Sequence, residues 1–151
     1  MPPLATPFVR DRLTWLTYLI NAWGTYSVAA ISPLMAFLAV DLSLNYTQRG
    51  LHTSTFAIGT MLAGVLTDRA AARFSRHRVL WAGGAGLAGG LLAVVLAPSP
   101  IVSLAGVFMV GLLGTAMFVM GQAALADDQG ENRSIAFSES SVGASIAGLF
   151  A

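Results

Sequence analysis

Long apolar stretches, separated by short polar segments, dominate this chain. Five of them are long enough to be membrane-spanning helices: residues 13–40, 50–67, 79–97, 101–126 and 134–151. A helix rises about 1.5 Å per residue, so about 20 residues cross the roughly 30 Å of hydrocarbon in a bilayer. The pattern therefore predicts an all-α fold, a multi-pass transmembrane helical bundle of about five spans.

The first apolar stretch is longer than a bilayer requires. Residues 13–40 make a helix of about 42 Å, which should tilt or project from the membrane. Pro33 lacks a backbone donor, so it should kink this helix or loosen its last turns. The polar residues 41–49 should form an outer loop, in which Asn45 or Thr47 caps the next helix.

The composition identifies lipid as the solvent of this chain. Hydrophobic residues make up 56% of it and charged residues only 10%, whereas soluble domains carry about 25% charged residues. The chain has no cysteine, which excludes disulfides, thiolate metal sites and a thiol nucleophile.

The arginines predict the orientation in the membrane. On one side of the predicted membrane lie Arg10, Arg12, Arg69, Arg73, Arg76, Arg78 and Arg133. Arg49 alone lies on the other side. Basic residues are retained in the cytoplasm, so we expect a cytoplasmic N-terminus, a cytoplasmic loop at residues 68–78, and insertion in the cell (plasma or inner) membrane.

Small residues recur at intervals of four in two of the predicted spans. Ala82, Gly86 and Gly90 lie in the third span, and Ser140, Ala144 and Gly148 lie in the fifth. Such ladders allow helix backbones to approach closely inside a membrane. They predict a compact bundle rather than isolated anchors.

The segment after the second span resembles a signature of the major facilitator superfamily of secondary transporters. That signature is Gly-x-x-x-Asp-Arg-x-Gly-Arg-Arg, and Gly64, Asp68, Arg69 and Arg73 match it in place. Ala71 and Ala72 replace its second glycine and following arginine. In an alternative alignment, which inserts residues 70–73, Ser75 replaces that glycine.

The resemblance implies a function and a role for this segment. Family members move small solutes by alternating access, without a bound cofactor, and the signature loop acts as a gating latch between their two halves. Gly64, Asp68, Arg69 and Arg73 would form that latch, with the carboxylate of Asp68 compensated by arginines or by a helix N-terminus. The alternative is topological, with the arginines only holding the loop inside.

The resemblance also implies that residues 1–151 are an incomplete N-terminal half. Family members have twelve spans, so we expect a missing C-terminal half as a partner and no transport by this chain alone. Gly24-Thr25 and Gly114-Thr115 sit early in the first and fourth spans, as repeated units would allow. The alternative is a non-transporting membrane scaffold or regulatory subunit.

Four polar residues inside the predicted spans are candidate substrate or ion contacts. Glu139 is either a proton, cation or substrate site, or an interfacial carboxylate partnered by Arg133 or serines. Asn21 and Thr25 share a face of the first span and should point into the bundle, with Gln122 opposite. Ordinary helix–helix hydrogen bonds are the alternative for these three.

Other function classes lack the residues that they require. His52 and His77 fall on opposite sides of the predicted membrane, so they cannot share a metal or serve a serine nucleophile at matching depth. There is no phosphate-binding loop and no lysine, so we expect no enzyme of that kind. The arginines follow the membrane boundary rather than a basic face, which argues against nucleic acid as a partner.

Overall fold

The computed structural model describes residues 8–151, and these contain helices and no strand. In chain order the helices are α1 (Arg12–Ala29), α2 (Ile31–Asp41), α3 (Tyr46–Phe74), α4 (Arg76–Val95), α5 (Pro100–Met109), the π-helix η1 (Val110–Gly114), α6 (Thr115–Gln129), the 3-10 helix η2 (Gly130–Asn132) and α7 (Arg133–Gly148). The predicted all-α fold is confirmed for this part of the chain.

The first apolar stretch is broken where the proline effect predicts. α1 ends at Ala29 and α2 begins at Ile31. The break therefore lies three to four residues before Pro33. The proline ring clashes with the carbonyl of the residue four positions earlier, here Ala29, and removes its hydrogen-bond donor. Asn45 then caps α3 through a reciprocal capping box with Gln48.

The predicted loop at residues 68–78 is helical except at Ser75. α3 continues to Phe74 and α4 starts at Arg76, so the signature residues lie on the last turns of α3 instead of in a loop. Ser75 makes the whole turn with a φ of 86°, a left-handed conformation that favours glycine. This geometry agrees with the alignment that places Ser75 at the glycine of the family signature.

Replacing Ser75 with glycine should stabilise the α3–α4 turn. A non-glycine residue held at positive φ costs about 1–3 kcal/mol, and glycine relieves most of that strain. We expect Ser75→Gly to raise the free energy of unfolding by about 1 kcal/mol, measured by thermal or denaturant unfolding in detergent. Ser54→Gly is the control, because Ser54 is exposed within α3 and glycine there should destabilise the helix by about 0.5–1 kcal/mol. Equal losses for both variants would contradict the prediction.

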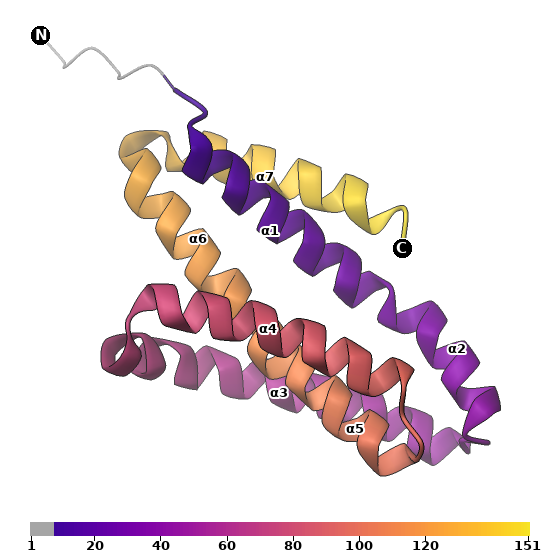
Figure 1. The fold of residues 1–151 in the computed structure, drawn as a ribbon. Coiled ribbons are helices and arrows are strands. Elements are labelled where there is room, and N and C mark those ends of the chain that lie inside the picture. The colour runs from indigo at the N-terminus through magenta and orange to yellow at the C-terminus, as the bar shows by residue number, and fades with distance from the viewer. Residues whose placement is uncertain (1–7) are drawn as a thin grey trace, which may run out of the picture.

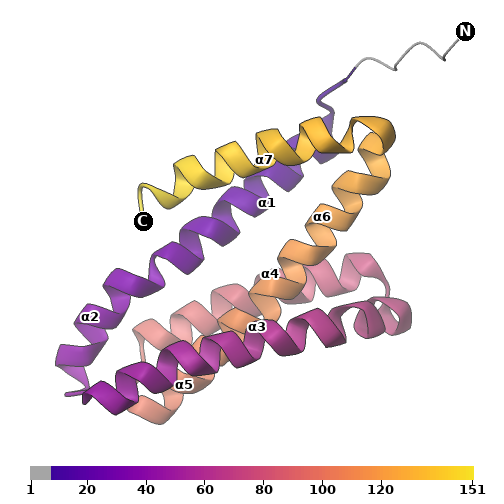
Figure 2. The same cartoon turned by 180° about the vertical axis from the view of Figure 1, so that it is seen from behind.

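The helices form two groups joined by α6. α1 and α7 lie side by side in both views, while α3, α4 and α5 pack together on the opposite side of the molecule (Figures 1 and 2). α6 crosses obliquely between these groups. Ser140 and Ala144 of the predicted α7 ladder are buried. The amide of Asn21 on α1 donates a hydrogen bond to the Ser140 hydroxyl, 2.7 Å away, so the ladder faces α1.

Glycine pairs set the closest helix crossings in the second group. A methyl group added at Gly90 would lie 2.9 Å from the carbonyl oxygen of Gly106, and one added at Gly106 would lie 2.8 Å from that of Gly90. At a second crossing, a methyl group added at Gly59 would lie 2.7 Å from the carbonyl oxygen of Phe108, and one added at Gly111 would lie 2.5 Å from that of Phe56. These backbone-to-backbone approaches explain why this bundle needs small residues at its crossings.

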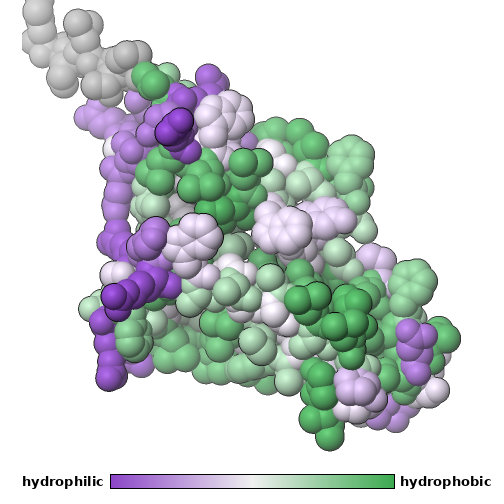
Figure 3. All heavy atoms as spheres, viewed as in Figure 1, coloured by the Kyte–Doolittle hydropathy of each residue, from purple (hydrophilic) through white to green (hydrophobic). Residues whose placement is uncertain are grey.

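Three helical stretches of the described residues are long and apolar enough to cross a membrane. They are Arg12–Asp41, Arg76–Val95 and Pro100–Gly148, and the last, with 49 residues, includes the predicted fourth span and most of the fifth. α3, which holds the predicted second span, is not among them, because the polar residues 52–55 lower its hydropathy. Hydrophilic residues gather along one edge of the molecule, next to the start of α1 (Figure 3).

The start of α1 is fixed by a charged cap. Asp11 accepts hydrogen bonds at 2.8 Å from both the backbone N–H and the hydroxyl of Thr14. The backbone bond, followed by the hydroxyl bond, lowers the pKa of the Asp11 carboxyl from its ordinary value. Gln129 at the end of α6 donates to the same Thr14 hydroxyl at 2.8 Å, which ties the cap to the neighbouring helix.

The Asp11 cap should therefore be sensitive to acid. A carboxyl whose folded pKa is lowered contributes stability above its unfolded pKa of about 3.9, and that stability is lost as the pH falls through the folded value. We expect the amide protection factor of Thr14 to be constant down to about pH 4 and to fall below it. Asp11→Asn, which keeps a neutral acceptor, should remove this pH dependence, and its persistence in that variant would contradict the assignment.

Candidate functional site

One space that several spans share lies between α1, α3 and α6. It is a cavity of about 470 Å³, to which α4 and η1 contribute Leu87, Val110 and Gly114. Its hydroxyl groups come from Thr25, Thr60 and Thr115, on three different helices. The dipeptides Gly24-Thr25 and Gly114-Thr115, which lie far apart in the sequence, both line it.

A second cavity of about 260 Å³ adjoins the first and shares Val28 and Phe56 with it. Its polar lining residues are Ser32, His52 and Thr53. We call the two cavities together the α1–α3 crevice. The crevice presents a few hydroxyls and one imidazole on apolar walls, which is the usual character of a site for a small organic molecule.

The hydroxyls of the crevice differ in how far they are already engaged. Thr60 donates to the carbonyl oxygen of Phe56 at 3.1 Å and keeps its lone pairs free to accept. Within residues 8–151, Thr25 and Thr115 make no side-chain hydrogen bond and are half-buried, so both can donate and accept. The three threonines can thus supply donors and acceptors to one bound molecule.

The π-helix η1 interrupts the fourth predicted span beside the crevice. It places Val110 and Gly114 in the crevice wall, and its Gly111 packs on the backbone of α3. Single-turn π-helices inside α-helices are frequent at functional sites. The sequence analysis did not predict this element, because a π-turn depends on packing and has no residue signature in the segment Val-Gly-Leu-Leu-Gly.

Glu139 lies outside the crevice, in a charged cluster that joins α7 to the start of α1. Its carboxylate accepts from Arg10 Nε at 2.9 Å and from Arg10 Nη2 at 2.5 Å, and Tyr18 donates to it at 3.1 Å. The hydrogen bond and the charge of Glu139 raise the pKa of Arg10. The prediction of Arg133 or serines as its partners is wrong, because Arg10 and Tyr18 bind the carboxylate.

The other two candidate contacts also lie apart from the crevice cavities. Asn21 is buried and donates to the hydroxyl and carbonyl oxygens of Ser140, while its own Oδ1 is buried without a partner. This pairing matches the alternative of a helix–helix hydrogen bond. Gln122 is half-buried on α6 and makes no hydrogen bond within residues 8–151. Of the four candidates, Thr25 alone lines the larger crevice cavity.

The signature residues lie on the exposed end of α3. Gly64, Asp68, Arg69 and Arg73 are all exposed, and no hydrogen bond or ion pair from residues 8–151 reaches Asp68. The expected compensation of Asp68 by a neighbouring arginine is therefore absent from this part of the chain. Arg73 lies 5.5 Å from the ring centroid of its neighbour Phe74.

Arg76 connects the α3–α4 turn to the end of α6. Its guanidinium forms an ion pair with Asp127, and both side chains are well exposed to solvent. Asp68 and Arg76 line the same cleft, to which α6 contributes Val119, Met120 and Ala123. The signature segment is thus positioned against α6, the helix that also carries Thr115 of the crevice.

Comparison with known proteins decides the family. The family model for the Major Facilitator Superfamily matches residues 14–151, which is nearly the whole chain. The chain belongs to the Major Facilitator Superfamily. No curated protein sequence and no solved structure matches it.

Membership of the Major Facilitator Superfamily explains the composition and the helices. The superfamily consists of membrane transporters, so this chain is an integral membrane protein and its apolar surface faces lipid. The expected membership of this superfamily is confirmed, and the role of the Gly64–Arg73 segment stays a prediction. The alternative of a non-transporting membrane scaffold or regulatory subunit is not favoured.

A buried histidine that the sequence analysis did not assign holds two helices of this superfamily member together. His52 on α3 is 2% exposed, with Nδ1 2.7 Å from the carbonyl oxygen of Gln48 and Nε2 2.7 Å from the hydroxyl of Ser103 on α5. Because a carbonyl only accepts, Nδ1 carries a hydrogen. The spacing of His52 and Ser103 gave no signal, since 51 residues separate them.

Proposed function

We propose that this chain moves a small solute across the cell membrane by alternating access, as part of a Major Facilitator Superfamily transporter and without a bound cofactor. Family membership supports transport as the activity. The main support for a solute site is the α1–α3 crevice, where threonines of three helices line one cavity. Sites between helices of a repeat-built transporter are where solutes are expected to bind.

The lining of the crevice favours an uncharged solute. Its hydrogen-bonding groups are hydroxyls and one imidazole, and none of the residues that line the two cavities is an aspartate, glutamate, lysine or arginine. The only carboxylate of α7, Glu139, is bound by Arg10 and Tyr18 away from these cavities. An ionic solute would lose its hydration there without a compensating charge. We therefore propose a small, mainly apolar solute with a few hydrogen-bonding groups.

We further propose five spans with the arginine-rich end in the cytoplasm. The hydrophilic edge in Figure 3 supports this placement, because it gathers charged residues at one end of the bundle. α3 would be the second span despite its lower hydropathy, since it packs lengthwise among α4, α5 and η1. In this orientation the turn at Ser75 lies at the inner surface.

Asp68 is the proposed centre of gating. It stands exposed on α3 with no ion pair within residues 8–151, so its carboxylate is available to a partner helix N-terminus. Gly64, Arg69 and Arg73 share this end of α3. Making and breaking that contact would accompany the opening and closing of the crevice at its inner end.

Cysteine accessibility tests whether the crevice is an aqueous pathway. The chain has no native cysteine, so Thr25→Cys, Thr60→Cys and Thr115→Cys each introduce a single thiol. In proteoliposomes we expect a membrane-impermeant maleimide to label all three, and Met61→Cys, which is exposed on the neighbouring face of α3, to label at least tenfold more slowly because that face contacts lipid.

The labelling pattern separates transport from a scaffold role. In the assembled transporter, alternating access requires that the three thiols be reached from either face of the membrane. Labelling from one face only would favour the scaffold or regulatory subunit. Failure of all three thiols to react would remove the crevice from the proposal.

A further inference from the structure

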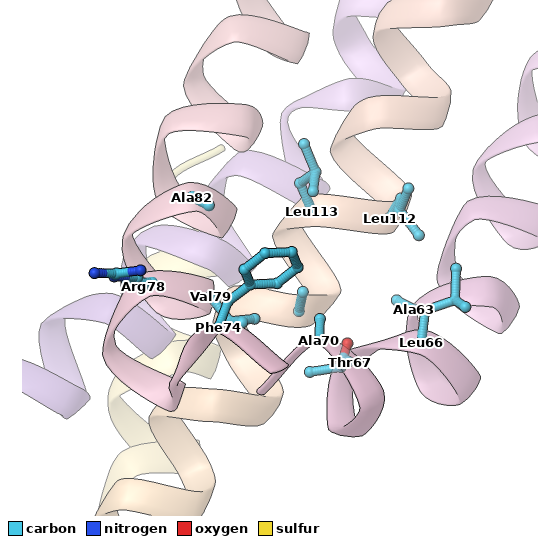
Figure 4. A pocket seen from close by; sticks show the side chains of 11 residues that line it. Ala63, Leu66, Thr67, Ala70, Phe74, Arg78, Val79, Ala82, Leu112 and Leu113 are labelled. Carbon is cyan, nitrogen blue, oxygen red and sulfur yellow. The ribbon is translucent and has the colours of Figure 1, made fainter. Parts of the chain in front are cut away.

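A separate apolar cavity opens beside the arginine-rich turn. It has a volume of about 320 Å³ and lies between α3, α4 and η1, where Leu112 and Leu113 face the side chains of α3 and α4 (Figure 4). Of its eleven lining residues, Thr67 and Arg78 alone have polar side chains. None of the α1–α3 crevice residues lines it, so it is a different site.

Thr67 brings an unmet hydrogen-bonding requirement to this cavity. The residue is 3% exposed, and its hydroxyl oxygen is buried without a hydrogen-bond partner. A buried hydroxyl that lacks a partner is costly, and most buried polar side-chain atoms in proteins have one. A bound molecule with a hydrogen-bond acceptor would therefore satisfy the Thr67 hydroxyl.

One arginine, Arg78, lines this cavity, and Arg69 and Arg73 lie at the same end of α3 as Asp68. Arg76 is paired with Asp127, but no ion pair within residues 8–151 engages Arg69, Arg73 or Arg78. Arg78 lines the cavity, and its guanidinium points away from the apolar walls (Figure 4). Basic pockets between transmembrane helices attract anionic lipid headgroups.

Arg78 and Thr67 lie at different depths, in the same order as the phosphate and the ester carbonyl of a phospholipid. Counted from Ser75, Arg78 lies three residues along α4 and Thr67 eight residues along α3. At about 1.5 Å per residue the hydroxyl is then roughly 7 Å deeper than the backbone of the arginine. A phosphate at Arg78, an ester carbonyl at Thr67 and an acyl chain along the leucines would meet all three features.

We propose that this cavity binds an anionic phospholipid. Arg78 pairs with the phosphate, the Thr67 hydroxyl donates to an ester carbonyl, and one acyl chain fills the groove between α3, α4 and η1. Bound lipid would touch Phe74 and Arg78 on either side of the turn at Ser75, so it would support the α3–α4 hairpin. The inference depends on these contacts and not on transport activity.

Lipid retention by the purified chain tests the proposal. The chain is reconstituted in vesicles of phosphatidylcholine with phosphatidylglycerol, re-extracted in mild detergent, and its bound lipids are counted by native mass spectrometry. We expect phosphatidylglycerol to be retained in preference to phosphatidylcholine. Arg78→Gln should lower its affinity about fivefold, the loss expected from one arginine near the surface. Arg133→Gln is the matched control, because Arg133 is also exposed at that end but does not line the cavity.

Two further variants separate groove binding from general attraction to anionic lipid. Ala82→Trp should fill the groove from an exposed position on α4 and abolish retention with every arginine present. Thr67→Val keeps the side-chain shape and should weaken both lipids. Unchanged retention in Ala82→Trp and Thr67→Val would overturn the proposal. So would a disulfide dimer of Ala82→Cys that excludes lipid, which would assign the groove to a second copy.

Discussion

Gly111→Ala is expected to destabilise the bundle strongly, because the added methyl group would meet the backbone of α3. A Cβ at this position would lie 2.5 Å from the carbonyl oxygen of Phe56, which belongs to the backbone of α3 and cannot rotate away. Overpacking of this kind costs about 1–3 kcal/mol, so α3 and η1 must separate. Thermal unfolding in detergent or nanodiscs should show the loss as a lower midpoint.

The matched control for this variant is Gly89→Ala. Gly89 is exposed on α4, and an added methyl group meets nothing within 4 Å. Alanine is the better helix former by about 0.5–1 kcal/mol, so this variant should be neutral or more stable. Equal stability of the two variants would show that α3 and η1 do not approach as closely as described.

Thr60→Trp is expected to close the α1–α3 crevice. The indole would enter the cavity of about 470 Å³ between α1 and α6, where Thr25 and Thr115 also lie. We expect at least a tenfold fall in the rate at which an impermeant maleimide labels Thr115→Cys, because water and solute can no longer reach that thiol. Solute transport by the assembled transporter should fall with it.

Met61→Trp tests whether position rather than size causes the effect. Met61 follows Thr60 in α3 but is 74% exposed on the outer face of the bundle. The indole there should rest in lipid and leave the labelling of Thr115→Cys unchanged. If both tryptophans slowed labelling equally, the crevice would not be the route to Thr115.

The sequence identified Glu139 as an unusual charge but could not predict its partner. The sequence identified Glu139 as an outlier in an apolar helix, and it left a functional site and an interfacial ion pair as alternatives. Its true partner, Arg10, lies 129 residues away. No local spacing predicts that contact, because it exists only when α7 packs along α1.

The α3–α4 turn shows the opposite case. The signature residues 64–73 and the arginines around them predicted a connection between two helices. The connection is present, but it is the single residue Ser75 instead of a loop over residues 68–78. The helical pattern of residues 68–74 was missed because their charges resemble a loop. Helical hydrogen bonds are satisfied within the backbone, so charged residues can extend a helix beyond the membrane.

The sequence by itself determined the solvent, the helical class, the arginine-rich end and the family resemblance. These depend on composition and on residues close together in the chain, where each apolar segment must satisfy its own backbone hydrogen bonds in lipid. Only the tertiary structure decided which polar residues meet. The crevice of Thr25, Thr60 and Thr115, the His52–Ser103 bond and the cavity at Thr67 each require helices distant in sequence to pack at one depth. That depth is set by the glycine crossings at Gly59–Gly111 and Gly90–Gly106, where backbones touch and no side chain intervenes.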